Sequence, residues 1–155
     1  MTSQDPLHPQ LAPGIEPELG ALLGVFSLHN YLETLMDEVD VCNDVPHFER
    51  KIIVWLDHPK RLGALARDMN ILPSTMTTHA DQLETRGLVT RERDPNDRRA
   101  WLLQLTPPGL ELRAEMVAKA RELFRGTLNL TEAELHSFSK VSQKIHSNIQ
   151  NITTC

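Results

Sequence analysis

Apolar side chains recur every three to four residues in two long stretches, one near each end of the chain. Residues 18–41 show this spacing, which predicts one long amphipathic helix. Near the other end, Thr106 can cap a second long helix that has Pro107 at its first position. Thr131 and Glu134 have the spacing of a capping box, which predicts the start of a last helix. The apolar face of this last helix consists of Leu135, Phe138, Val141, Ile145, Ile149 and Ile152.

Three shorter helices are predicted between the long ones. They cover residues 47–56, 61–70 and 72–87. The third has Pro73 at its first position and Gly87 just past its end, which is the usual placement of proline and glycine around a helix. The positions expected to face the core are Leu65, Ala66 and Met69 in the second of these helices and Met76, Ala80 and Leu83 in the third.

The last two of these short helices are expected to form a helix-turn-helix. The turn between them holds Asn70, a residue that can adopt the left-handed conformation that ends a helix. Residues 88–93 and 100–105 are strand-like, and residues 94–99 join them as a charged hairpin loop. A helix-turn-helix followed by a β-hairpin is a winged helix. We therefore expect a mainly α fold with a small β-hairpin wing and long N- and C-terminal helices.

Charge is distributed unevenly along the chain. The whole sequence carries 16 basic and 21 acidic residues, for a net charge of −5. Residues 58–101 hold eight basic and six acidic residues, so this segment has a net charge of +2 and the remainder −7. A locally basic winged helix is typical of a protein that binds a phosphate-rich partner.

The third short helix carries a polar face suited to a DNA groove. The major groove admits one helix, and the N-terminal residues of that helix lie nearest the base edges. Hydroxyl groups there can donate or accept hydrogen bonds, and threonine methyls can contact thymine methyls. The alternative is an ordinary solvated face. The residues predicted to contact DNA are Ser74, Thr75, Thr77, Thr78 and Gln82.

The hairpin supplies the cations that this helix lacks. Arginines on a narrow hairpin can enter the minor groove or neutralise phosphates. We expect Asp94 and Asp97 to support the wing by accepting from backbone amides of the turn and by orienting a guanidinium. A solvated hairpin held by its own ion pairs is the alternative. The wing residues predicted to contact DNA are Arg91, Arg93, Asn96, Arg98 and Arg99.

The central segment resembles the MarR family of transcriptional regulators. The marks of the resemblance run from Leu65-Ala66 through Gly87-Leu88-Val89 and the Asp94–Arg99 turn to Gly109. It implies a homodimer that binds near-palindromic duplex operators, with Arg99 as the minor-groove arginine and Asp97 supporting it. This chain departs from the family pattern at three positions of the third short helix. It has Thr78 where the family often carries an arginine, Gln82 where the family often carries another basic residue, and His79 where an aliphatic residue is usual.

These observations divide the chain into four parts. Residues 1–17 hold four prolines and predict a flexible arm, with neither the basic nor the apolar region of a signal peptide. Residues 18–45 are expected to form an N-terminal dimerisation helix and 46–106 the DNA-binding winged helix. Residues 107–155 are expected to form C-terminal dimerisation helices, because the apolar faces of the terminal helices exceed what the small winged-helix core can cover. Folding back onto their own domain is the alternative.

The resemblance also implies an effector, since many members of the family respond to a small anionic aromatic ligand or to oxidation of a cysteine. Five aromatic or basic side chains could line a pocket for such a ligand, although they could equally be core or surface residues. Cys42 has no basic neighbour that would lower its thiol pKa, and we interpret it as a packing residue. The candidate pocket residues are His29, Tyr31, His47, Trp55 and Arg67.

Other classes of function have little support in the sequence. There is no nucleophile motif, glycine-rich phosphate loop, paired-carboxylate setting or metal-ligand spacing, so we expect neither an enzyme nor a cofactor or metal site. Cys42 and Cys155 form no CxxC motif and predict free thiols in the cytoplasm. No apolar run approaches the ~20 residues that span a bilayer, which excludes a membrane protein. The interpretation is a ligand-responsive repressor. The alternatives are a protein-interaction winged helix without DNA binding, or a redox- or metal-sensing protein of the same fold.

Overall fold

The computed structural model describes residues 14–40 and 45–153, and for residues 36–40, Arg98 and Thr153 it describes the backbone alone. The chain forms two compact units, Met1–His47 and Phe48–Cys155. In the first unit, α1 (Pro17–Asp40) is a single 24-residue helix, as the spacing of its apolar residues predicts. Among the described helices none has the length and hydrophobicity needed to cross a bilayer.

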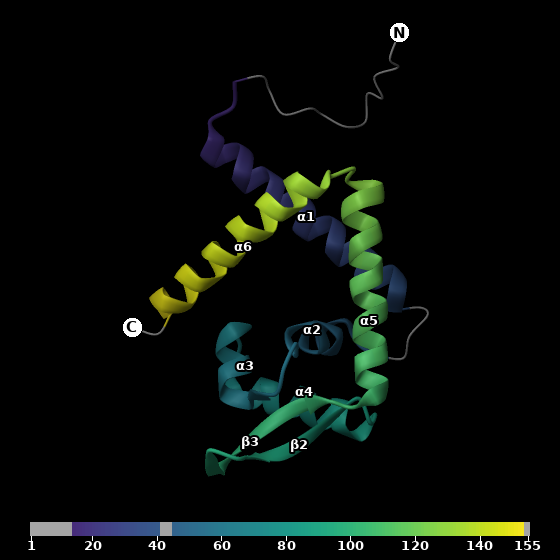
Figure 1. The fold of residues 1–155 in the computed structure, drawn as a ribbon, viewed down its shortest axis with the longest axis vertical. Coiled ribbons are helices and arrows are strands. Elements are labelled where there is room, and N and C mark those ends of the chain that lie inside the picture. Colours follow the sequence, from purple (N-terminus) through teal and green to yellow (C-terminus); the bar gives the residue numbers. More distant parts are fainter. Residues whose placement is uncertain (1–13, 41–44, 154–155) are drawn as a thin grey trace. The chain divides into compact units, whose positions relative to one another are not determined.

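The second unit is a winged helix followed by two long helices (Figure 1). This confirms the predicted fold class, mainly α with a small β-hairpin wing. Its strands form one antiparallel sheet in the order β1-β3-β2. In chain order the elements are α2 (His47–Trp55), β1 (Lys60–Arg61), α3 (Leu62–Asp68), α4 (Pro73–Thr85), β2 (Val89–Asp94), β3 (Asp97–Leu105), α5 (Pro107–Glu122), the π-helical turn η1 (Leu123–Thr127) and α6 (Glu132–Thr153).

The core of the winged helix lies between its three short helices and the sheet. The predicted inner stripe of α4, Met76, Ala80 and Leu83, is completely buried. The same holds for Leu65 of α3 and Leu103 of β3, so residues far apart in sequence share one core. Met69 is only half-buried, because it follows the last residue of α3 and caps that helix.

The ends of the short helices follow the local signals. Asn70 has φ 53° and Gly87 has φ 72°, so both take the left-handed conformation expected after a helix. Pro73 is the first residue of α4, and Leu72 before it is extended, with φ −67° and ψ 141°. The capping box is also confirmed, since Thr131 N donates to Glu134 Oε2 and Glu134 N donates back to Thr131 Oγ1.

The hairpin is tighter than the sequence predicts. Asp94 pairs with Asp97 in the ladder, so Pro95 and Asn96 alone connect the strands, and the predicted loop over residues 94–99 is wrong. The Asp94 carboxylate accepts from the backbone N–H of Asn96 at 2.8 Å and closes the turn within two residues. The strands therefore extend to the tip, and the arginine pair after Asp97 belongs to β3.

Strand β1 was not predicted from the sequence. The sequence predicts two helices over residues 47–56 and 61–70, with the second beginning at Arg61, and no strand between them. Instead Lys60 and Arg61 pair with Leu103 and Leu102 of β3, and α3 begins at Leu62. Two residues are too few to show the alternation of a strand, so only the pairing with β3 identifies β1.

The wing is attached to α5 by a close backbone contact. Thr106 caps α5, as predicted: its hydroxyl accepts from Gly109 N at 3.4 Å and donates to Gly87 O at 2.6 Å. The Thr106 backbone N–H donates to Leu88 O. A β-carbon at Gly109 would overlap that same carbonyl oxygen, so only glycine allows the helix to start there.

We expect Gly109→Ala to destabilise the protein by roughly 2 kcal/mol or more, since backbone must move to relieve the clash. Gly63→Ala is the matched control. It lies in α3, where an added methyl group would meet no atom within 4 Å, and it should stabilise the protein by about 0.5 kcal/mol. Urea unfolding followed by circular dichroism measures both. Equal stability of Gly109→Ala and the wild type would contradict the contact.

Candidate nucleic-acid interface

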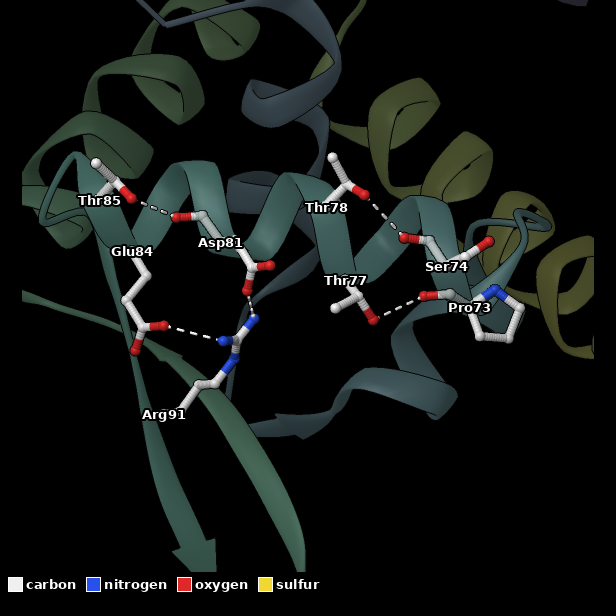
Figure 2. Close-up of polar contacts among 8 residues, drawn as sticks. All are labelled: Pro73, Ser74, Thr77, Thr78, Asp81, Glu84, Thr85 and Arg91. Atoms are coloured by element: carbon white, nitrogen blue, oxygen red, sulfur yellow. Dashed lines mark hydrogen bonds and ion pairs between the residues drawn. The ribbon is translucent and has the colours of Figure 1, made fainter.

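The outward face of α4 is a row of small polar side chains. Opposite the buried stripe, Ser74, Thr77, Thr78, Asp81 and Gln82 are exposed, while Thr75 is half-buried. Figure 2 shows four of these side chains, from Ser74 to Asp81, along the helix. This places four of the five predicted recognition residues on one accessible surface.

The threonine hydroxyls on this face are already engaged as donors. Thr77 Oγ1 donates to Pro73 O at 2.9 Å, and Thr78 Oγ1 donates to Ser74 O at 3.1 Å (Figure 2). Thr85 does the same to Asp81 O at 2.9 Å in the last turn. Each hydroxyl proton therefore points back along the helix, which leaves oxygen lone pairs and methyl groups to face outward.

Arg91 joins the wing to α4. From β2 its guanidinium reaches Asp81 Oδ1 at 2.5 Å and Glu84 Oε2 at 3.0 Å (Figure 2). The Arg91 side chain is 23% exposed, so the two ion pairs are partly shielded from solvent. The contact offsets the negative charge of Asp81 in the middle of the outward face and sets the position of β2 against the helix.

A second set of contacts, made to one buried carboxylate, lies at the inner edge of α4. The buried carboxylate of Glu49, on α2, lies 3.6 Å from His79 Nδ1 and 3.3 Å from Arg86 Nε. His79 also stacks on Phe48, with ring centroids 4.5 Å apart. The unusual histidine in α4 thus has an acidic partner on α2. Neither Glu49 nor Arg86 was predicted from the sequence, although Glu49 shares a helix face with the apolar pair Ile52 and Ile53.

The wing is held at its tip by an arginine that was also not predicted from the sequence. Arg61 of β1 donates from Nε to Asp94 Oδ2 at 2.8 Å, and its terminal nitrogen lies 2.6 Å from the same oxygen. A second terminal nitrogen lies 3.6 Å from Asp97 Oδ2, and Asp97 also accepts from the backbone N–H of Arg99 at 3.1 Å. Asp94 thus accepts from an amide of the turn and Asp97 from an amide of β3, and both share one guanidinium. No local sequence pattern marks Arg61 as a wing residue, because only the pairing of β1 with β3 brings it to the wing.

These contacts perturb Asp94. It is buried, and the N–H of Asn96 followed by the Arg61 guanidinium holds the pKa of its carboxyl below the ordinary value of 3.8. The carboxylate is therefore charged over the physiological range and belongs to the structure of the turn.

The remaining wing residues whose side chains are described are exposed to solvent. Arg93 is exposed and stacks on Trp101 across the ladder, with its guanidinium carbon 4.0 Å from the ring centroid. Asn96 and Arg99 lie at the tip, and both are exposed. Arg98 lies in β3, but its side chain is outside the described part of the structure.

The candidate effector residues are divided between the two units. In the first, Glu33 lies 3.8 Å from His29 and 3.4 Å from His47, and Tyr31 is exposed. In the second, Trp55 contacts His146 of α6 with ring centroids 5.1 Å apart, and Arg67 is exposed. Their assembly into one pocket therefore stays a prediction.

The cysteines that a redox sensor would need lie outside the described residues. Cys42 and Cys155, like the proline-rich residues 1–13, are not among them. Within the described ranges no group of three histidine, cysteine, aspartate or glutamate residues could hold a metal ion.

Comparisons with known proteins agree with this geometry. The model of the MarR family matches residues 53–101, from Ile53 near the end of α2 to Trp101 in β3. An uncharacterised HTH-type transcriptional regulator of Bacillus subtilis is 27% identical over 132 residues, which span 83% of this chain and 80% of that protein.

Solved structures show the same fold. The transcriptional regulator BldR from Sulfolobus solfataricus matches with a TM-score of 0.68 and 22% identity, over 88% of this chain and 99% of its own. FabT from Streptococcus pneumoniae, solved in complex with DNA, matches with a TM-score of 0.66 and 18% identity, over 87% and 99% of the two chains.

We expect Asp94→Asn to lower the free energy of unfolding near pH 7, because the amide cannot replace the anion facing Arg61. The folded pKa of Asp94 is depressed, so its contribution is fully present above 3.8 and is lost as pH falls through the lower folded value. The difference in the free energy of unfolding between the wild type and Asp94→Asn should therefore become smaller in acid. Urea unfolding between about pH 7 and pH 3 measures it.

Glu92→Gln, an exposed charge removal on the same strand, is the control and should change stability little at neutral pH. A deficit of Asp94→Asn that is the same at both ends of the pH range would show that the charge of Asp94 is not what stabilises the turn.

Proposed function

This chain belongs to the MarR family through residues 53–101, and from that premise we propose that it represses transcription as a homodimer on a near-palindromic operator. It is a transcriptional regulator with a DNA-binding fold and not an enzyme. The observation that carries the proposal is the joint exposure of the polar face of α4 and of the wing residues Arg93 and Arg99.

In the proposed complex α4 lies in the major groove. Its outward face carries side chains short enough for the helix to approach the base edges. Ser74, Thr77 and Thr78 occupy its N-terminal half, the part nearest the bases, and Gln82 follows one turn later. Thr75 lies at the edge of this surface and is assigned to it on its position alone.

The wing supplies the positive charge. Arg99, exposed beside the turn, is proposed to enter the minor groove, while Arg93 and Asn96 contact the backbone. Arg98 is proposed as a further contact from its place in the chain alone. The role proposed for Arg91 is to position β2 against α4, because its guanidinium is engaged by Asp81 and Glu84. Asp94 and Asp97 hold the tip through Arg61.

Dimerisation is proposed through the apolar faces of α1 and α6. Both helices expose large apolar side chains at helical spacing, and such surfaces are typical of interfaces. A twofold dimer would present two copies of α4 about 34–36 Å apart, one duplex turn, which matches a near-palindrome. The exposed residues are Leu19, Leu22, Val25 and Phe26 on α1 and Phe138, Val141, Ile145, Ile149 and Ile152 on α6.

A small anionic aromatic effector is proposed to relieve repression. His47 and Trp55, at the two ends of α2, bring a basic and an aromatic side chain to the helix that also carries Glu49. Since Glu49 holds His79 and Arg86 of the α4 region, a ligand on α2 would be coupled to the recognition helix. Thermal shift with aromatic carboxylates tests for the ligand, and titration of the operator complex tests for release.

We expect Arg99→Ala to weaken operator binding and to reduce the slope of log K against log[salt] by about one, because one phosphate-region cation is lost. Fluorescence anisotropy at several salt concentrations measures both quantities. Arg121→Ala, an exposed arginine in the last turn of α5, is the control and should leave them unchanged. Unaltered affinity of Arg99→Ala at matched salt would rule out its role. Absence of binding to any duplex by the wild type would favour a protein-interaction winged helix.

We expect Ile145→Glu to convert the dimer to a monomer, because a carboxylate would be buried in the apolar interface of α6. Analytical ultracentrifugation measures the state of assembly. Gln143→Glu adds the same charge on the polar side of the same helix and should leave the dimer intact. A wild-type protein that sediments as a monomer at micromolar concentration would refute the dimer.

A further inference from the structure

The direction of the threonine hydroxyls restricts what α4 can recognise. A free hydroxyl can donate or accept, so a threonine face alone does not specify a base. Here Thr77 and Thr78 both donate to backbone carbonyls four residues earlier, at 2.9 and 3.1 Å. Outward, each presents an acceptor oxygen and a methyl group.

Asp81 extends the same acceptor surface by one turn. It is exposed, and its carboxylate has no proton to donate at neutral pH. Arg91 holds it through Oδ1 and offsets its charge, so its presence does not exclude nucleic acid. Ser74 and Gln82 carry donors as well as acceptors, and the inference is confined to Thr77, Thr78 and Asp81. α4 itself contains no lysine or arginine that could donate to a base.

Base edges in the major groove differ in what they offer to such a surface. Guanine presents only the acceptors N7 and O6, which oppose an acceptor oxygen. Adenine presents the N6 amino donor, and the thymine paired with it presents a methyl group in the same groove. Cytosine has an amino donor but no methyl. A side chain that shows an acceptor beside a methyl therefore matches an A·T pair better than a G·C pair.

We propose that Thr77 and Thr78 select A·T pairs, with each hydroxyl oxygen accepting from an adenine amino group and each methyl contacting a thymine methyl. Asp81 disfavours guanine at the neighbouring position. In this proposal α4 recognises the amino and methyl groups of the bases, while the wing supplies affinity for the DNA backbone. This inference rests on the proposed DNA-binding function and assigns the chemistry of its half-site.

The test combines base analogues with matched side-chain changes in the full-length protein. Duplexes selected from a random pool by the wild type define the half-site. In these, purine replaces single adenines, which removes the N6 amino group, and uracil replaces single thymines, which removes the methyl. Thr77→Val and Thr78→Val keep a methyl and remove the acceptor, whereas Thr77→Ser and Thr78→Ser keep the acceptor and remove the methyl.

For the wild type we expect purine at one adenine per threonine to weaken binding about three- to tenfold, the range of one neutral hydrogen bond. The corresponding valine variant should bind the purine and adenine duplexes equally. The serine variant should stop distinguishing uracil from thymine at the same base pair. Thr85→Val is the control: it loses an equivalent hydroxyl bond at the far end of α4 and should respond to the analogues as the wild type does.

Three outcomes overturn the inference. The selected half-site could contain guanines whose replacement weakens binding by the wild type but not by the valine variants. That result would mean that the threonine hydroxyls turn outward and donate to guanine. Valine variants that remain as sensitive to purine as the wild type would remove the threonines from the readout. Both outcomes leave DNA binding itself intact. Failure to select any duplex would overturn the proposed function and the inference with it. The wild-type measurements with base analogues do not depend on the folding of any variant.

Discussion

α4 buries Met76, Ala80 and Leu83 completely, and this requirement determines which side of the helix faces outward. With that stripe against the core, the threonines and Asp81 lie on the opposite side and form an accessible polar row. The same rotation turns His79 and Arg86 toward Glu49 and places Asp81 and Glu84 within reach of Arg91. Packing of three apolar side chains thus orients the surface proposed to meet DNA.

Arginines from other elements offset the acidic residues around this surface. Arg91 bridges Asp81 and Glu84, and Arg61 bridges Asp94 and Asp97. These pairs serve two purposes: they fix the wing relative to the helices, and they reduce repulsion between carboxylates and a polyanion. A protein with a net charge of −5 can in this way present a local surface suited to nucleic acid.

Local signals predicted much of the fold. Pro73, Gly87, Thr106 and the Thr131 capping box mark helix ends through backbone preferences that operate within four residues, and each lies where the sequence places it. The hairpin loop was predicted too long. The Asp94–Asn96 bond that shortens it is local, but it competes with other turn geometries that the same residues allow.

The sequence by itself determined the order of the helices and of the two hairpin strands, the buried stripe of α4 and the identity of the polar residues opposite it. Periodicity and capping suffice for these, because they depend on neighbours in the chain. Tertiary structure alone decided the roles of Arg61, Arg91 and Glu49, whose partners lie on other elements. The inward direction of the threonine hydroxyls is different: it is a local property of the α4 backbone, since helix geometry brings the carbonyl four residues back within reach, but the residue types alone allow either direction.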